Sequence, residues 1–369
     1  MKEITIGKNE AGQRFDKFLG KYMNLAPRSF FYKMLRKKNI TLNGKKASGS
    51  EILSEGDQVK LFLSDETIGK FSQVPAVPVA GKTHTDRRDD RKRAGHISGS
   101  LHILYEDADT IFIDKPVGML SQKARPEDIS LTEYLTAYLL ESGQITEEEL
   151  RTFHPAVCNR LDRNTSGIVA AGKSLAALQE LSAMFRERTM KKYYLCLVKG
   201  EVERPEYIRG YLVKDHEANR VEVFAGKSGR RTAGQPHTAE NPGSAGRDGA
   251  SLIETEYRPL KSSKGVTLLE VHLITGKTHQ IRAHLASQGH PLAGDYKYGD
   301  RRFNDDLKRT YGLASQMLHA YRLCMPQVDR GVLSSLSGKE ICAPLPELFE
   351  RICRDKGVMD GWQPGIQED

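Results

Sequence analysis

One acidic residue stands in a polar turn directly before an apolar segment, where a carboxylate could do chemistry. Asp162 lies between Arg160 and Arg163, and the apolar residues 167–171 predict a short buried strand. A carboxylate in this setting can act as a nucleophile or a general base, and the neighbouring guanidinium groups favour its ionised form. It can also be a turn residue that accepts hydrogen bonds from local backbone amides. The segment taken alone favours the turn residue.

Three histidines, His279, His284 and His290, raise the question of a metal site. Their spacing does not match the HExxH pattern, and no cysteine lies nearby to complete a ligand set. A structural role in capping or packing is the better prediction for them. The chain also has no dinucleotide fingerprint and no P-loop, so the sequence predicts neither a metal nor a cofactor.

The residues around Asp162, NRLDRNTSG at 159–167, resemble the RLDxxTSG signature of the RluA-type pseudouridine synthases, the ribosomal large-subunit branch of that enzyme class. Further segments resemble family motifs and follow in the family's order: DKPVGM at 114–119, KYYLCLVKG at 192–200, GKTHQIRAH at 276–284 with GD and YG at 294–299, and MLHA at 317–320. The resemblance covers about residues 101–354. Asn159 departs from the pattern, because the family commonly has histidine there.

The resemblance implies an α+β catalytic domain built on a mixed, mainly antiparallel sheet. It also implies an isomerase that breaks the bond from ribose C1′ to uracil N1 and joins C1′ to C5. This reaction is redox-neutral and needs no group donor, so no cofactor is expected. The expected substrate is structured RNA, with large-subunit (23S) ribosomal RNA or a ribosome-assembly intermediate as the first candidate.

Three residues receive catalytic roles from the resemblance. Asp162 is the essential carboxylate, and whether it attacks the sugar or abstracts a proton stays open. Arg282 matches the arginine that pairs with this carboxylate, and a bidentate guanidinium would hold it ionised and aimed; the alternative is a helix-surface arginine. Tyr194 matches the tyrosine that stacks on the uracil and assists proton removal from C5; the alternative is a core aromatic in a strand.

Other cations near these motifs are candidates for RNA contact. Arg160 matches the arginine that fills the helix after the target base has flipped out. For Arg163, a phosphate contact and a solvated side chain are equally good interpretations. We also expect Lys115 to be one of the RNA-binding residues. It lies with Gly118 in a loop beside the site, which Pro116 would stiffen.

The N-terminal segment concentrates positive charge, with ten Lys or Arg and one acid between residues 13 and 46. Apolar residues at helical spacing predict a first helix from Phe15 to Tyr22 and a second from about Ser29, with Asn39 as its left-handed terminator. Asn43-Gly44 predicts a tight hairpin turn. This arrangement resembles the S-four-type RNA-binding domain. The expected RNA-binding residues are Arg14, Arg28, Lys33, Arg36, Lys37 and Lys38, although a merely solvated face is the alternative.

These patterns divide the chain of 369 residues into four parts. We expect an S-four-like domain at 1–65, a flexible linker at 66–100, the catalytic domain at 101–355 and a tail at 356–369. A Gly-, Ser- and Arg-rich segment at 225–251 has no apolar period and predicts an insertion.

The overall composition agrees with an RNA-binding protein. The net charge is +8 and the pI is near 9.1, which favours an anionic partner. Five scattered cysteines without a CxxC pair indicate a reducing compartment, and no apolar run reaches the length of a membrane span. We therefore expect a cytoplasmic monomer. The rival hypotheses are a non-catalytic ribosome-assembly factor, which would not need Asp162 and Arg282, and a carboxylate-dependent hydrolase, which would need a second acid or a metal.

Overall fold

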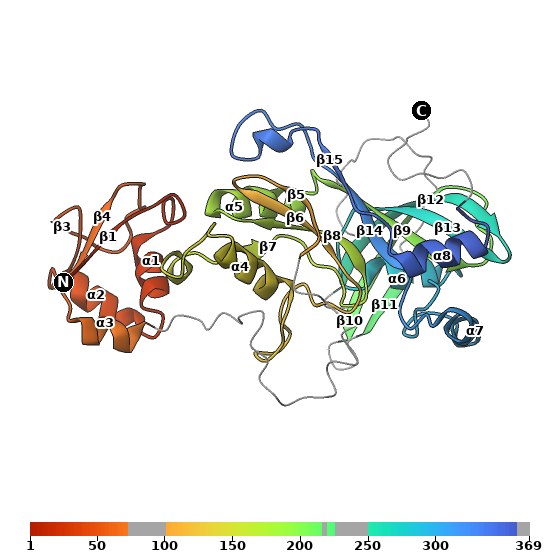
Figure 1. Ribbon diagram of the computed structural model, residues 1–369, viewed down its shortest axis with the longest axis horizontal. Coiled ribbons are helices and arrows are strands. Elements are labelled where there is room, and N and C mark those ends of the chain that lie inside the picture. Colours follow the sequence, from red (N-terminus) through yellow and green to blue (C-terminus); the bar gives the residue numbers. More distant parts are fainter. Residues whose placement is uncertain (73–100, 216–219, 226–249, 360–369) are drawn as a thin grey trace.

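The computed structural model describes residues 1–72, 101–215, 220–225 and 250–359. These residues form a small N-terminal unit and a large second unit, which lie next to each other along the long axis of the molecule (Figure 1). Most of the expected linker, nearly all of the 225–251 segment and the last ten residues lie outside the described ranges. Within those ranges, no helix is long and apolar enough to cross a membrane.

The N-terminal unit packs helices against a four-stranded antiparallel sheet with the strand order β1-β4-β2-β3. The predicted apolar faces of its first two helices are buried, and Asn43 and Gly44 both have positive φ, as the predicted tight hairpin turn requires. Its elements are β1 (Lys2–Thr5), α1 (Phe15–Tyr22), α2 (Arg28–Arg36), β2 (Ile40–Leu42), β3 (Lys45–Lys46), β4 (Gln58–Leu61) and α3 (Asp65–Phe71).

Two local predictions for this unit are wrong. Residues 66–71, expected in the linker, belong to α3: Ile68 is buried, and the Phe71 ring lies 4.8 Å from that of Phe30. The helix is short, so its apolar spacing is a weak signal. The left-handed residue after α2 is Lys38, with φ 59°, and not Asn39. Asn39 instead donates its backbone N–H to Met34, which closes the helix one residue later.

The second unit is built on a large mixed sheet, as the fold class predicted. In the described part of the chain it has eleven strands in the order β11-β10-β12-β13-β9-β14-β8-β6-β5, with β15 beside β14 and β7 beside β8. All neighbouring strands are antiparallel except β8 and β14, which are parallel. The strands are β5 (Ile103–Glu106), β6 (Thr110–Lys115), β7 (Ala156–Val157), β8 (Ser166–Gly172), β9 (Lys191–Lys199), β10 (Glu206–Asp215), β11 (Arg220–Ala225), β12 (Ser251–Ser263), β13 (Val266–Leu273), β14 (Leu318–Cys324) and β15 (Glu340–Cys342).

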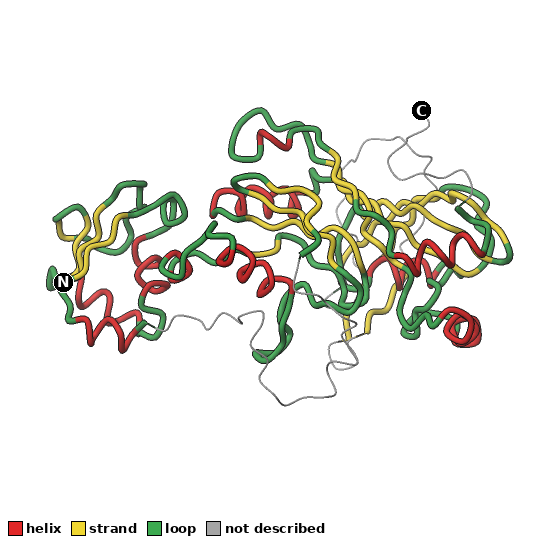
Figure 2. Tube along the Cα trace, viewed as in Figure 1, coloured by secondary structure: helices red, strands yellow, loops and turns green. Residues whose placement is uncertain are grey.

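Helices cover both faces of this sheet (Figure 2). One face buries apolar residues of α4 and α6, and the other buries residues of α5, α7 and α8. Alternate residues of a strand point to opposite faces of the sheet, and β9 supplies both cores in this way. Tyr194 and Cys196 lie in the first core, and Leu195 and Leu197 lie in the second. The helices are α4 (Leu131–Glu141), α5 (Leu175–Glu187), α6 (Gln280–Ser287), α7 (Arg301–Tyr311) and α8 (Glu347–Asp355).

The second unit does not stop at residue 355, where the tail was expected to begin. Val358 is buried in the same core as Phe349 and Ile352 of α8, and its N–H donates to Cys353. A single apolar residue after a helix gives no periodic signal in the sequence. Core packing therefore continues into the predicted tail.

The strand register brings distant motifs into one row of the sheet. Ala320 on β14 lies between Gly167 on β8 and Tyr194 on β9. Gly167 has φ 108°, and a Cβ there would lie 2.2 Å from the carbonyl oxygen of Ala320. Only glycine allows this approach, so the start of β8, directly after the Asp162 loop, is fixed against β14, and the other neighbour of β14 is the strand that carries Tyr194.

Candidate active site

Asp162 lies in the loop between β7 and β8 and keeps 27% of its side chain exposed. Its backbone carbonyl, and not its side chain, closes the local turn by accepting the N–H of Thr165 at 3.0 Å. The carboxylate accepts a hydrogen bond from Arg282 in α6, 120 residues away. The side chain thus serves a long-range contact, which argues against a simple turn residue.

Arg282 connects two carboxylates. Its Nη1 donates to Oδ2 of Asp162 at 2.9 Å, while Nε and Nη2 donate to Oδ2 and Oδ1 of Asp295 at 2.7 and 3.0 Å. The expected pairing with Asp162 is present, but the bidentate partner is Asp295 and not Asp162. Asp295 belongs to the GD motif at 294–295, but the sequence suggested no role for it. Its side chain is 1% exposed, and its two contacts aim the guanidinium of Arg282 toward Asp162.

The loop that carries Asp295 is itself held rigidly. Its Oδ1 accepts the backbone N–H groups of Lys297 and Tyr298, and Arg282 and these amides hold the pKa of the buried Asp295 carboxyl below its usual range against the effect of burial. Asn304 of α7 accepts from the N–H of Gly294 and donates to the carbonyl of Asp295, each at 2.8 Å. Helix α7 therefore fixes the position of Arg282 through this loop.

The two oxygens of the Asp162 carboxylate differ. Oδ2 accepts from Arg282, and Nε2 of His279 lies 3.9 Å from the same oxygen. No hydrogen bond to Oδ1 comes from any residue in the described ranges. The arrangement leaves one oxygen of an ion-paired carboxylate available to react.

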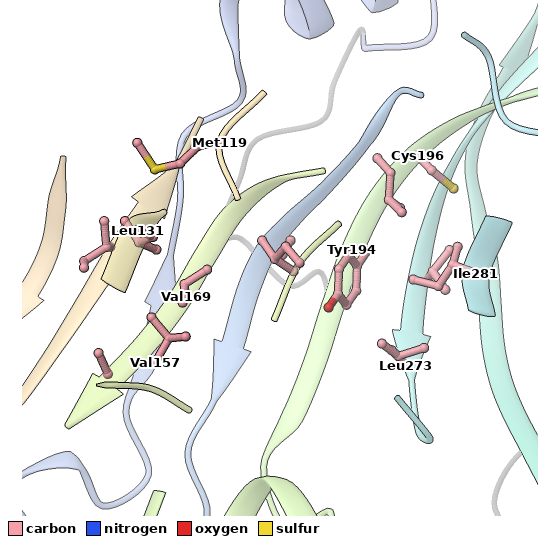
Figure 3. Close-up of a cluster of buried hydrophobic side chains, with 14 of the residues drawn as sticks. Met119, Leu131, Val157, Val169, Tyr194, Cys196, Leu273 and Ile281 are labelled. Carbon is pink, nitrogen blue, oxygen red and sulfur yellow. The ribbon is translucent and has the colours of Figure 1, made fainter. Parts of the chain in front are cut away.

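Tyr194 is close to this carboxylate but belongs largely to the core. It is 7% exposed and packs among Cys196, Leu273 and Ile281 (Figure 3). Burial, and in addition the charge of Asp162, raise the pKa of Tyr194 well above its usual range, so its hydroxyl stays protonated at neutral pH. The ring therefore fits the core-aromatic alternative.

Lys115 was expected to contact RNA, and this prediction is wrong. The residue is fully buried, and its Nζ donates to the backbone carbonyls of Pro116, Met119 and Arg163 at 2.9, 2.9 and 3.1 Å. Burial lowers the pKa of Lys115 to about 7, although Asp162 and Asp114 partly offset this effect. Its role is to join the 116–119 loop to the Asp162 loop. A lysine next to a proline in sequence gives no sign of burial.

The remaining cation candidates are placed where solvent or RNA can reach them. Arg160 and Arg163 are exposed on either side of Asp162, while the backbone of Arg163 is held by the N–H of Gly118 at 2.9 Å. In the N-terminal unit, Arg14 forms two hydrogen bonds with Asp16, so its charge is already paired. Five cations of α2 and the residues directly after it are exposed: Arg28, Lys33, Arg36, Lys37 and Lys38. None of these five forms a salt bridge within the described residues.

Two functional candidates were missed in the sequence. His279, expected to be structural, begins α6 beside Asp162, and its Nδ1 lies 2.9 Å from the hydroxyl of Tyr298. The ring of Tyr298 also lies under Arg282, with 5.3 Å from the guanidinium carbon to the ring centroid. Both residues are in the quoted motifs, so their position could have been suspected, but not their contact.

Two further polar residues of the motifs, Asn159 and His284, are structural. Asn159, which stands where a histidine is usual, donates to the carbonyl of Ile168 and accepts from the N–H of Ala170, so it pairs with β8 like a strand backbone. His284 is buried against the hydroxyl of Thr255 at 3.0 Å, as expected for a packing role.

The N-terminal unit contacts the second unit through a few polar groups. Thr152 donates to Glu10 at 2.5 Å, and Glu148 accepts from Lys2 and Tyr22 at 3.2 and 3.3 Å. These contacts set the exposed cations of α2 at a defined place relative to the sheet.

Comparisons with known proteins agree with this architecture. Residues 109–287 match the family described as RNA pseudouridylate synthase, and residues 13–59 match the S4 domain. The ribosomal large subunit pseudouridine synthase C of Vibrio parahaemolyticus is 30% identical over 357 residues, covering 95% of this chain and 94% of the relative. The protein of the same name from Escherichia coli (strain K12) is 29% identical over 352 residues, covering 95% of each chain. Human RNA Pseudouridylate Synthase Domain Containing 4 has a similar fold, with a TM-score of 0.52, 21% identity, and coverage of 68% of this chain and 91% of the human one.

Proposed function

Because this chain belongs to the RluA-type family of RNA pseudouridine synthases and carries an N-terminal S4 domain, we propose that it isomerises uridines of 23S ribosomal RNA with Asp162 as its catalytic carboxylate. The chain is an RNA pseudouridine synthase, an intramolecular isomerase. The observation that carries the catalytic assignment is the Asp162 carboxylate, with one oxygen held by Arg282 and the other without a hydrogen bond from the described residues.

The reaction needs a group that acts at the sugar and a path for one proton. The bond from C1′ to N1 breaks, C1′ joins C5, and the proton on C5 leaves while N1 takes up a proton. A free carboxylate oxygen can attack C1′ or remove a proton from the sugar. Asp162 supplies such an oxygen, and Arg282 keeps its partner oxygen in place.

Tyr194 is a protonated phenol in this arrangement. It can take the C5 proton only if its own proton passes to another group at the same time, and the nearby Asp162 is a suitable acceptor. We therefore assign to Tyr194 a hydroxyl that moves a proton and a ring that mainly supports the core.

The proposed substrate follows from the relatives and from the charge of the N-terminal unit. The relatives are named for the ribosomal large subunit, and the exposed cations from Arg28 to Lys38 offer contacts to phosphates. Arg160 beside the site is suited to fill the space that a flipped uridine leaves. With this ribosomal substrate, we propose a cytoplasmic location for the activity.

The first experiment is the variant Asp162→Asn, which keeps the shape of the side chain and removes its negative charge. We expect no tritium release from RNA labelled at uracil C5, with RNA affinity within about twofold of the wild type, because the amide oxygen of the new side chain can still accept from Arg282. Mapping pseudouridines in ribosomal RNA from cells with and without the gene checks the substrate. Near-normal turnover by Asp162→Asn would refute the catalytic assignment.

A further inference from the structure

His279 occupies a special position at the start of α6. It has a left-handed backbone with φ 54°, which is uncommon for a residue other than glycine, and its side chain is only 10% exposed. Strained backbone of this kind persists where the surrounding structure fixes it, and it is often found at functional sites. The strain directs the imidazole toward Asp162.

A chain of hydrogen bonds leads from β11 to His279 and favours one position for the imidazole proton. The N–H of Val221 on β11 donates to the hydroxyl oxygen of Tyr298 at 2.9 Å. The Tyr298 hydroxyl oxygen lies 2.9 Å from Nδ1 of His279, and its one proton can be donated to this nitrogen. In that arrangement Nδ1 is the acceptor, and the proton of a neutral imidazole is on Nε2.

The buried position of His279 favours the neutral ring. Burial lowers the pKa of His279, and Arg282 and Lys297 act in the same direction, while Asp162 and Asp295 oppose them. A neutral ring is the form that can accept from Tyr298. Nε2–H then faces Oδ2 of Asp162 at 3.9 Å, a distance longer than a hydrogen bond; such contacts commonly shorten in substrate complexes.

We propose that His279 is a positioning residue for this reaction, held by Tyr298 with its proton on Nε2, so that His279 and Arg282 restrain Oδ2 of Asp162 and leave Oδ1 as the reacting oxygen. This inference rests on the proposed role of Asp162. It gives a function to the hydrogen bonds that run from Val221 through Tyr298 to His279. These bonds connect the edge strand β11 to the residue beside the Asp162 carboxylate.

The decisive variants are His279→Asn and His279→Gln. Asparagine tolerates the left-handed backbone at least as well as histidine, so His279→Asn should fold while its shorter side chain no longer reaches Asp162. We expect its single-turnover rate to fall about tenfold to a hundredfold, the range for loss of one hydrogen bond to a charged group, with unchanged RNA affinity. Glutamine can accept from Tyr298 and donate toward Asp162, so His279→Gln should recover part of the rate.

A spectroscopic test does not depend on activity. In protein labelled with ¹⁵N-histidine, the His279 resonances, identified by their loss in His279→Asn, should show a bare Nδ1 and a protonated Nε2. In Tyr298→Phe, which keeps the ring under Arg282, this preference should weaken. His290→Asn is the matched control, because His290 lies against Gly200 beyond the far end of β9, and it should leave the rate unchanged.

Each outcome separates this inference from the proposed function. A normal rate for His279→Asn, or an equal loss in His279→Asn and His279→Gln, overturns the positioning role. A proton on Nδ1 in the wild type overturns the hydrogen-bond chain. If these failures occur while Asp162→Asn is inactive, the proposed function stands; if Asp162→Asn is active, both are wrong.

Discussion

Single side chains with buried charge determine how the Asp162 loop is held. Lys115 is the clearest case, because the three N–H groups of its ammonium meet three carbonyls from two loops. Lys115→Met keeps the volume and removes these bonds, so buried carbonyls lose their donor. We expect the free energy of unfolding to fall by about 1–3 kcal/mol. We also expect turnover to be lost. Chemical denaturation and single-turnover kinetics measure both effects.

The same residue predicts a pH effect with a definite sign. Burial lowers the pKa of Lys115 to about 7 in the folded protein, compared with 10.5 in a free side chain. Between these values the unfolded chain binds more protons, so the stability of the wild type should rise with pH relative to Lys115→Met. Parallel stability curves for the two proteins from about pH 7 to about pH 9 would instead show that the three carbonyls keep the ammonium charged.

Residue identities could be predicted better than residue geometry. The pairing of Asp162 with Arg282 followed from the resemblance, and the structure contains it. The bidentate contact of Arg282 with Asp295 could not be predicted, because it depends on how the loop after α6 returns to the helix. The burial of Lys115 was missed for a similar reason, since burial of a charge depends on acceptors that are distant in sequence.

Short elements with a strong period were predictable, whereas contacts between elements were not. The bounds of α1 and β8 and the start of α2 agree with the apolar patterns to within about one residue. Helix α3 was missed, because one buried residue in seven gives no period. The parallel contact of β8 with β14 has no local signal in either strand.

A test at the level of elements uses Gly167, where β8 meets β14. In Gly167→Ala the new Cβ would meet the Ala320 carbonyl at 2.2 Å in a backbone with φ 108°, so we expect a loss of about 2–5 kcal/mol in stability and displacement of the Asp162 loop. Gly265→Ala is the control, because Gly265 also has positive φ but has no atom within 4 Å of the new Cβ. It should cost only about 1–2 kcal/mol. Equal losses in thermal unfolding would show that the approach of the two strands is not the cause.

In the whole molecule, the S4 domain and the catalytic sheet are joined by polar contacts around Glu148 and Thr152. Removing residues 1–72 leaves a polar surface, so the remaining chain should fold. Each phosphate contact that is lost should reduce the slope of log affinity against log salt by about 0.7–0.9. The truncated enzyme should still convert a uridine in a short stem-loop at high concentration.

The matched control for this deletion is the full chain with Lys33, Arg36 and Lys37 replaced by Gln, which keeps the domain and removes exposed charge. Filter binding over a range of salt concentrations compares the three proteins. If the triple variant keeps the wild-type slope while the deletion flattens it, the domain binds RNA by another surface. If the deletion abolishes all chemistry in a well-folded protein, the domain completes the active site.

The parallel pair of β8 and β14 has a consequence for the order in which the enzyme comes into being. Ser166, at the end of the Asp162 loop, is hydrogen-bonded to His319, 153 residues further along the chain. While the ribosome is still making the protein, Asp162 emerges long before the strand that must lie beside its loop, and contacts between such distant residues form late in folding. A nascent chain can therefore present a folded S4 domain, which closes over fewer residues, well before it can hold a carboxylate against Arg282. The polypeptide becomes able to bind RNA first and to modify it only after the strand that carries His319 has been made.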